Sequence, residues 1–142
     1  MSLSYHNKLF EFLYPDGWAL DEARTGEGFT VSLQSPYSMF VLVSYYDAVL
    51  DPKKLADQAL ETMTEEYDEL DSVPISVSIA KLPAVGHDVN FFSLDLTNTC
   101  WIRAFISGSH SVLIFAQTSD LDLERGELAF RGICASLKFS AH

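Results

Sequence analysis

The sequence has few cysteines, and neither is placed as a disulfide partner or a metal ligand would be. It contains only Cys100 and Cys134, each flanked by apolar residues. A disulfide framework needs more cysteines in a shorter secreted chain, and the CxxC spacing of metal sites is absent. The segment Met1–Lys8 also lacks the apolar stretch of a secretory signal. We therefore expect two buried thiols in a reducing compartment, which predicts a cytoplasmic protein.

Basic residues are scarce as well. Nine lysines and arginines stand against 20 aspartates and glutamates, so the formal net charge is −11 and the isoelectric point is near 4.5. This balance argues against a nucleic-acid partner, whose phosphates are held by lysine and arginine. No apolar run approaches the roughly 20 residues that span a bilayer, so no membrane insertion is expected.

Signatures of catalysis, phosphate binding and metal binding are missing. The GxGxxG, GxxxxGK[ST] and GxSxG motifs do not occur. The segment Asp120–Glu124 resembles the start of a calcium loop, but Gly126 comes one place late and Arg131 replaces the final acid. No histidine pair has HxH or HExxH spacing, although His87, Asp88 and another acid could still assemble in space. We predict a non-catalytic protein without a metal site or cofactor.

Apolar residues, in contrast, are abundant. Hydrophobic residues make up 48% of the 142 positions and aromatic residues 13%, which excludes a disordered chain. No repeat or linker divides the chain, so we expect one domain over residues 1–142.

Alternating apolar residues and turn signals predict a sheet-rich fold. The expected strands are Leu9–Tyr14, Phe29–Leu33, Met39–Tyr46, Val73–Ala80, Val89–Thr97, Cys100–Ser107 and His110–Thr118. We expect turns at Pro15–Gly17, at Pro83 with Gly86, at Asn98–Thr99 and at Gly108–Ser109, with His110 in solvent at the last hairpin tip. Trp101, Phe105, Ile114, Phe92, Leu94 and Leu96 would share one face, and Phe91, Ile102 and Phe115 would share the other. Because both faces are apolar, each requires a cover.

Two helices are expected to provide that cover. Asp51 caps the first, which starts at Pro52 and carries an apolar stripe of Leu55, Ala59, Met63, Tyr67 and Leu70. Ser119 or Asp120 caps the second, which runs through Leu123, Phe130, Cys134 and Leu137. Gly126 and Gly132 weaken this helix, and close approach to the sheet would compensate.

Six residues are candidates for binding. Arg103 is expected on the face of Trp101, where it either pairs with an acid or anchors an anionic ligand in an aromatic concavity. Tyr45 and Tyr46 alternate across their strand, and we select Tyr46 as the outward one. Seven of the 20 acids lie between Asp57 and Asp71, and form an acidic ridge that serves either solubility or a basic partner. Its candidate residues are Glu61, Glu65 and Asp68.

The order of these features resembles a known family. Phe12–Trp18 resembles the "YPxGW" start of Mog/PsbP-like domains, and Ser136–Phe139 resembles the "SFRF"-type close of that family. The resemblance implies an α+β fold in which helices flank an antiparallel sheet of six or seven strands on both faces, an α/β/α sandwich. Members include extrinsic photosystem subunits, a Ran-binding import factor and chaperones for secreted effectors. The matching residues belong to turns and core, so the resemblance implies a fold and no catalytic constellation.

We therefore predict a non-catalytic protein-interaction, chaperone or adaptor module. Its partner would be a protein that is basic or has an exposed apolar segment, and a homodimer is also open. The alternative is a carrier that holds a small apolar or amphipathic ligand between sheet and helix, with Arg103 as anchor.

Overall fold

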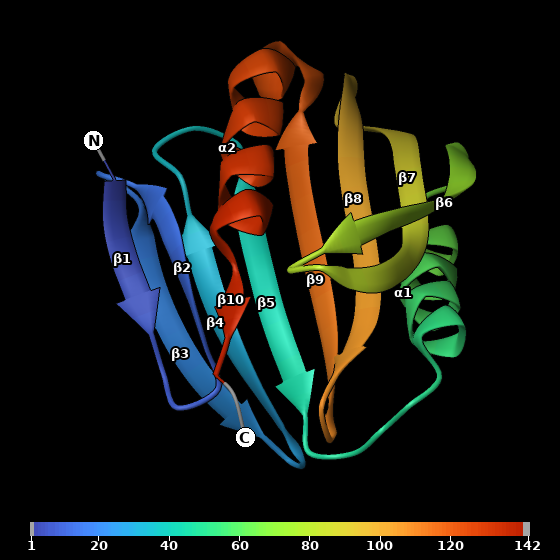
Figure 1. The fold of residues 1–142 in the computed structure, drawn as a ribbon. Coiled ribbons are helices and arrows are strands. Elements are labelled where there is room, and N and C mark those ends of the chain that lie inside the picture. Colours follow the sequence, from blue (N-terminus) through green and yellow to red (C-terminus); the bar gives the residue numbers. More distant parts are fainter. Residues whose placement is uncertain (1, 141–142) are drawn as a thin grey trace.

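A computed structural model describes residues 2–140, and Met1, Ala141 and His142 lie outside the described residues. Within that range the chain forms two α-helices, a short 3₁₀ helix and ten strands (Figure 1). The helices are α1 (Pro52–Glu66), η1 (Asp120–Asp122) and α2 (Leu123–Ser136). The strands are β1 (Ser2–His6), β2 (Phe10–Pro15), β3 (Ala19–Thr25), β4 (Gly28–Gln34), β5 (Phe40–Tyr46), β6 (Leu70–Ile79), β7 (Leu82–Ser93), β8 (Leu96–Ser107), β9 (His110–Ser119) and β10 (Lys138–Phe139).

The strands are divided between two antiparallel sheets. The large sheet has seven strands in the order β3-β4-β5-β9-β8-β7-β6, which agrees with the predicted strand number. The small sheet has the order β1-β2-β10 and joins the two ends of the chain. The predicted strand Leu9–Tyr14 corresponds to β2 and therefore lies in the small sheet. Strands β1, β3 and β10 have no counterpart among the predicted strands.

Side chains of the large sheet alternate between two apolar layers. Trp101 and Phe105 belong to a larger core with α2 and the small sheet, whereas Ile102 and Ala104 belong to a smaller core with α1. The α+β class is thus confirmed. The predicted three-layer α/β/α sandwich is not, because a second sheet shares with α2 the side of Trp101.

Helix α1 begins where the sequence predicts and ends earlier. The Asp51 side chain accepts a hydrogen bond from the backbone N–H of Lys53 at 3.0 Å, with Pro52 at the first helical position. Tyr67 is the C-cap, and Leu70 starts β6 instead of completing the helical stripe. The last turn carries no basic residue, so no side-chain cation stabilises the helix dipole at this end.

Two hairpin turns lie at unexpected positions. Ala80 and Lys81 have φ of 52° and 65°, and Leu94 and Asp95 have φ of 54° and 61°. Positive φ at both central residues is the signature of a type I′ turn, which usually selects Asn-Gly. The predicted turn at Asn98–Thr99 is therefore wrong, and these residues pair within β8. The predicted turn at Pro83 and Gly86 is also wrong, since both residues lie in β7.

Although this turn was misplaced, the side chains of β8 and β9 lie on the faces of the sheet that the sequence predicts. Phe92 pairs with Thr97, whereas the predicted loop would have paired it with Phe105. The observed and the predicted partner of Phe92 are an even number of residues apart, so the side chains of both strands stay on their predicted sides of the sheet. However, Phe92, Leu94 and Leu96 are exposed at the hairpin end and do not join the core. The turn predicted at Gly108–Ser109 is confirmed, because Ser107 pairs with His110 and Gly108 has φ of 59°.

Gly86 allows β7 to cross closely over β8. A Cβ at this position would lie 1.7 Å from the carbonyl oxygen of Ile102. Figure 1 shows the β6–β7 hairpin leaving the plane of the large sheet and reaching across β8 and β9 toward α2. The glycine thus positions the hairpin tip over the side of the sheet that α2 covers.

Helix α2 is anchored by its glycine and its aromatic residue. A Cβ at Gly126 would lie 3.2 Å from Met39 Sδ, which confirms the expected close approach. The same expectation is wrong for Gly132, which has nothing within 4 Å. Phe130 stacks on Trp101 with ring centroids 5.0 Å apart. The helix ends at Ser136, and Leu137 is its C-cap.

Candidate functional site

A groove of about 540 Å³ lies between α1 and the strands β5 and β9, and we call it the α1 groove. Its strand residues alternate onto the side of the sheet that α1 partly covers. Phe40 and Phe115 stack on its floor with ring centroids 6.1 Å apart. The other lining residues are Leu42, Ser44, Tyr46, Ala59, Thr62, Met63, Glu66, Tyr67, Leu113 and Gln117. The groove is therefore an apolar surface that α1 leaves half covered.

The acidic ridge borders this groove. Among the described residues that line it, Glu66 alone carries a charge. Tyr46 lines the groove, as expected for the outward member of its pair, while Tyr45 is buried in the larger core. Glu61 and Glu65 are exposed on α1, and Asp68 is exposed just beyond it. Tyr46 thus lies in the groove, whereas the acidic candidates lie on the helix that borders it and just beyond that helix.

A second groove, of about 880 Å³, lies between α2 and the tip of the β6–β7 hairpin, and we call it the α2 groove. Its walls are the hairpin residues 77–82 on one side and α2 with β10 on the other. Arg103 and Ser107 contribute from β8. The residues from α2 and the segment after it are Phe130, Arg131, Cys134, Ala135, Leu137, Lys138 and Phe139.

Arg103 is the buried cation of the α2 groove. Only 8% of the residue is exposed, and its Nη1 lies 2.8 Å from Asp88 Oδ1. No donor is aligned for a hydrogen bond with that oxygen, so the contact is an ion pair. Nη1 also donates to the Ile102 carbonyl at 3.0 Å. The guanidinium carbon lies 5.6 Å from the centre of the Phe130 ring, within the range of a cation–π contact. Arg103 therefore pairs with an acid, which is one of the two alternatives that the sequence left open, and it also lines the groove. Its role as the anchor of an anionic ligand stays a prediction.

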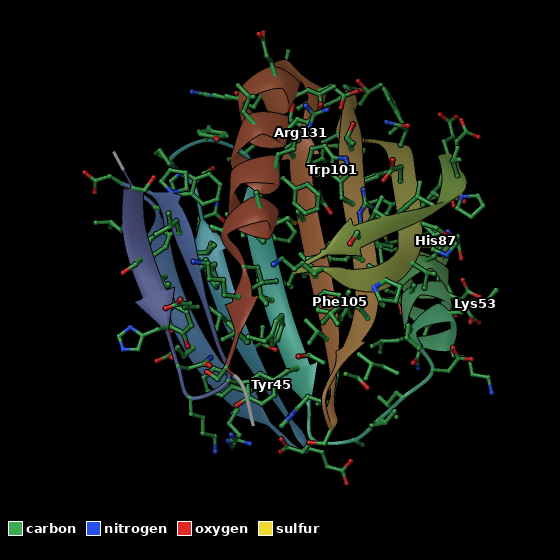
Figure 2. All side chains as sticks on the ribbon, in the orientation of Figure 1. Tyr45, Lys53, His87, Trp101, Phe105 and Arg131 are labelled. Atoms are coloured by element: carbon green, nitrogen blue, oxygen red, sulfur yellow. The ribbon has the colours of Figure 1, made fainter. Side chains whose placement is uncertain are left out.

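Trp101 lies in the core beside this groove. It is 6% exposed and stacks behind Phe130, which itself forms part of the groove wall. Figure 2 shows Trp101 and Arg131 beside α2, whereas His87 and Lys53 lie beside α1. Arg103 and Trp101 thus lie on the opposite side of the sheet from Tyr46, and the six candidate residues do not form one site.

Both cysteines are free, but only Cys100 is buried as the sequence predicts, whereas Cys134 is partly buried and lines the α2 groove. Burial raises the pKa of Cys134 to about 12, although the nearby charge of Arg103 lowers it somewhat. Burial also raises the pKa of Cys100. Neither thiol has the lowered pKa that a nucleophilic cysteine needs.

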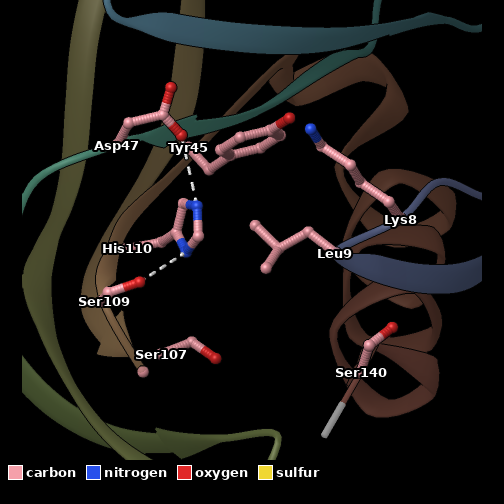
Figure 3. Close-up of a pocket in the computed structure, with 9 residues that line it drawn as sticks. Lys8, Leu9, Tyr45, Asp47, Ser107, Ser109, His110 and Ser140 are labelled. Carbon is pink, nitrogen blue, oxygen red and sulfur yellow. Dashed lines mark hydrogen bonds and ion pairs between the residues drawn. The ribbon is translucent and has the colours of Figure 1, made fainter. Parts of the chain in front are cut away.

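A third pocket surrounds His110 at the end of the β8–β9 hairpin (Figure 3). His110 Nε2 lies 3.2 Å from Asp47 Oδ1, and its Nδ1 lies 3.4 Å from Ser109 Oγ. Asp47, His110 and Ser109 are thus connected in the order of an acid, a base and a nucleophile. However, the distance between His110 Nδ1 and Ser109 Oγ is long for a hydrogen bond. The His110 ring also packs edge-on against Tyr45 at 5.5 Å. The prediction of a solvated His110 is wrong, because only 23% of its side chain is exposed.

The metal site that the sequence left open does not form. His87 Nε2 lies 2.7 Å from Asp57 Oδ1, which is on α1, while Asp88 pairs with Arg103 on the other side of the sheet. No group of three or more potential ligands assembles among residues 2–140. Asp122 accepts hydrogen bonds from Ser38 Oγ at 2.6 Å and from Arg125, so it joins two segments of the fold.

Comparisons with known proteins define the fold. No model of a known protein family matches the chain, and no curated protein matches it significantly. PsbP (CyanoP) from Synechocystis sp. PCC 6803 matches with a TM-score of 0.70 at 9% identity, over 98% of this chain and 92% of that protein. LpqN from Mycobacterium tuberculosis, described as involved in cell envelope biogenesis, matches with a TM-score of 0.65 at 12% identity, over 93% of this chain and 83% of LpqN.

A third solved structure extends the comparison. PA94 from Pseudomonas aeruginosa, a protein of unknown function and putative regulator, matches with a TM-score of 0.54 at 14% identity, over 92% of this chain and 91% of PA94. The chain therefore has a PsbP-like fold, as its resemblance implied. At these identities the likeness concerns the fold and carries no function. Neither described α-helix is long and apolar enough to cross a membrane.

Sequence reasoning missed the ring of cations around the α2 groove. Lys81 from the β6–β7 turn, Arg131 from α2 and Lys138 from β10 join Arg103 of β8 there. They have no common spacing, so only the topology reveals the cluster. The apolar residues Phe40, Leu42 and Phe115 were recognisable as strand residues, but their incomplete cover by α1 was not.

Proposed function

We propose that this protein is a non-catalytic interaction module that holds an apolar or amphipathic segment of a partner protein in the α1 groove. The observation that carries the proposal is the half-covered apolar floor of β5 and β9 beside an acidic helix. A helix laid into an apolar groove is a recurring mode of peptide recognition. Glu66 at the groove and the exposed Glu61 and Glu65 favour a segment flanked by lysine or arginine. The chaperone or adaptor role expected from the sequence is a use of the same surface.

The test uses a short amphipathic peptide of leucine and lysine as a defined probe. We expect saturable binding that weakens as salt increases, because the acidic rim acts through screened charges. Leu42→Arg should abolish binding by placing a cation on the apolar floor. Leu128→Arg is the matched control, since Leu128 is exposed on α2, away from the groove. If the leucine–glutamate counterpart binds equally well, the charge argument fails; if Leu42→Arg has no effect, the groove is not the site.

The α2 groove supports a second candidate function, the carriage of a small amphipathic ligand between sheet and helix. The observation that favours it is the position of Arg103, which lines an apolar cavity rather than an entirely packed core. Two free cysteines further support a role in a reducing compartment such as the cytoplasm. Thermal stabilisation of the purified protein by an alkyl-chain ligand would test the carrier role.

A further inference from the structure

We propose that the α2 groove binds the anionic head group of a single-chain alkyl amphiphile such as a fatty acid. This inference deepens the second candidate function and rests on it. It names the chemical class of the ligand, the residues that recognise its charge and the surface that holds its chain.

The distribution of charge is the first argument. Lys81, Arg103, Arg131 and Lys138 line this groove, so it collects four of the nine basic residues of a chain with a net charge of −11. Among the described lining residues there is no aspartate or glutamate. Two acids that do not line the groove form ion pairs with these cations: Asp88 with Arg103, and Glu127 with Arg131 at 2.7 Å. Lys81 and Lys138 have no ion-pair partner within residues 2–140. Glu11 lies opposite Lys138 in the pairing of β10 with β2. The side chains that line the groove nevertheless carry only positive charge, which favours an anion there.

The geometry of Arg103 is the second argument. Its polar contacts within residues 2–140 all involve Nη1, which meets Asp88 and the carbonyls of Ile102 and His87. A guanidinium has five N–H donors, so the Nε and Nη2 edge retains donors for a ligand. That edge matches a carboxylate or phosphate through two parallel hydrogen bonds. Because the side chain is largely buried, a slender head group reaches it more readily than a folded acidic surface.

The apolar walls are the third argument, and they select an amphiphile over a simple anion. Leu82 and Ile79 on the hairpin face Phe130, Leu137 and Phe139 across the groove. Val77 at the hairpin is 42% exposed, so apolar surface continues to the rim. The volume of about 880 Å³ lies within the range of ligand pockets, roughly 300–1,000 Å³. An alkyl chain would cover this surface while its head group reaches Arg103.

The experiment compares dodecanoate with uncharged dodecanol, both below micellar concentrations, by calorimetry on the full chain. We expect saturable dodecanoate binding that is about tenfold tighter than dodecanol binding, the range of one charge-assisted hydrogen bond. Arg103→Gln should weaken dodecanoate binding about tenfold. Arg103 is buried and its replacement leaves Asp88 unpaired, so the exposed-side variant Lys81→Gln/Lys138→Gln provides a second measurement. We expect it to fold normally and to weaken binding about threefold. Lys53→Gln/Lys54→Gln on α1 is the matched control and should leave the affinity unchanged.

The outcomes separate this inference from the carrier role. Equal binding of dodecanol and dodecanoate overturns the head-group assignment and leaves the carrier role standing. Failure of both ligands to bind overturns both. Unchanged dodecanoate affinity in the double lysine variant and in Arg103→Gln overturns the assigned residues. Binding to anionic phospholipid vesicles without binding of monomeric dodecanoate assigns the cations to a membrane surface and overturns the proposal, as does tighter binding of a leucine–glutamate peptide.

Discussion

Replacing Gly86 with alanine should destabilise the protein strongly, because no side chain fits where β7 crosses β8. The new Cβ would lie 1.7 Å from the oxygen and 2.7 Å from the carbon of the Ile102 carbonyl, and 3.1 Å from Arg103 Cα. All three contacts are with backbone, so no rotamer change relieves them. The two strands must separate locally, which weakens the pairing of Gly86 with Arg103 and of Val85 with Ala104.

The magnitude follows from opposing terms. Overpacking of a well-packed interior costs about 1–3 kcal/mol, and a backbone clash belongs at the upper end. The reduced freedom of the unfolded chain with alanine offsets this by about 0.4–1 kcal/mol. We therefore expect a net loss of about 2 kcal/mol in the free energy of unfolding. For a chain of this size, the midpoint of thermal unfolding should fall by roughly 6 °C.

Gly132→Ala is the matched control, because it makes the same chemical change at an open helical position. Gly132 is exposed in α2, and a methyl group at this residue would have nothing within 4 Å. Removing a helical glycine should stabilise the protein by up to about 1 kcal/mol. Urea unfolding followed by circular dichroism measures both variants. If Gly86→Ala unfolds at the same urea concentration as the wild type, the close crossing of β7 over β8 is refuted, and with it our account of the hairpin that walls the α2 groove.

Three further predictions concern the core, an ion-pair cluster and the thiols. Phe130→Ala should lower the free energy of unfolding by about 3–4 kcal/mol, measured by urea unfolding, because it removes the buried ring that stacks on Trp101 and leaves a cavity. Hydrogen bonds from Lys53 and then His87 lower the pKa of Asp57, so its stabilising effect is present above the unfolded pKa of about 3.9 and disappears as the pH falls through the lower folded value. The gap in melting temperature between the wild type and Asp57→Asn should therefore be constant from neutral pH to mildly acidic pH and close in strong acid; a gap that widens in acid would contradict this. Iodoacetamide at about pH 8 should label Cys134 and Cys100 far more slowly in the native protein than in urea, because burial raises both thiol pKa values. Rapid native labelling, detected by mass spectrometry, would refute that burial.

The sequence predicted those features that depend on neighbouring residues. Asp51 and Pro52 fixed the start of α1, and Gly108 identified the β8–β9 turn, because caps and type II′ turns have local chemistry. The turns at Ala80–Lys81 and Leu94–Asp95 escaped prediction, since neither pair contains the glycine or asparagine that positive φ usually selects. Tertiary packing imposes these conformations, so local propensity does not reveal them.

The candidate site was predictable only residue by residue. Tyr46 and Arg103, which the sequence singles out, each line a groove, but their separation onto opposite sides of the sheet depends on the global register. The small sheet joins β1 and β2 to β10 from the far end of the chain, and no sequence periodicity encodes that pairing.

The net charge of −11 is distributed unequally between the two grooves. Phe115 of the α1 groove pairs with Ile102, and Arg103 of the α2 groove pairs with Ile114, so the grooves lie on opposite sides of adjacent strands. Acidic residues gather beside the first groove and basic residues around the second. A cationic partner segment is therefore attracted to one side of the sheet and repelled from the other, while an anionic ligand experiences the reverse. Under the two proposed functions, this charge separation across one sheet would let the two grooves select different occupants, which apolar contact alone would not achieve.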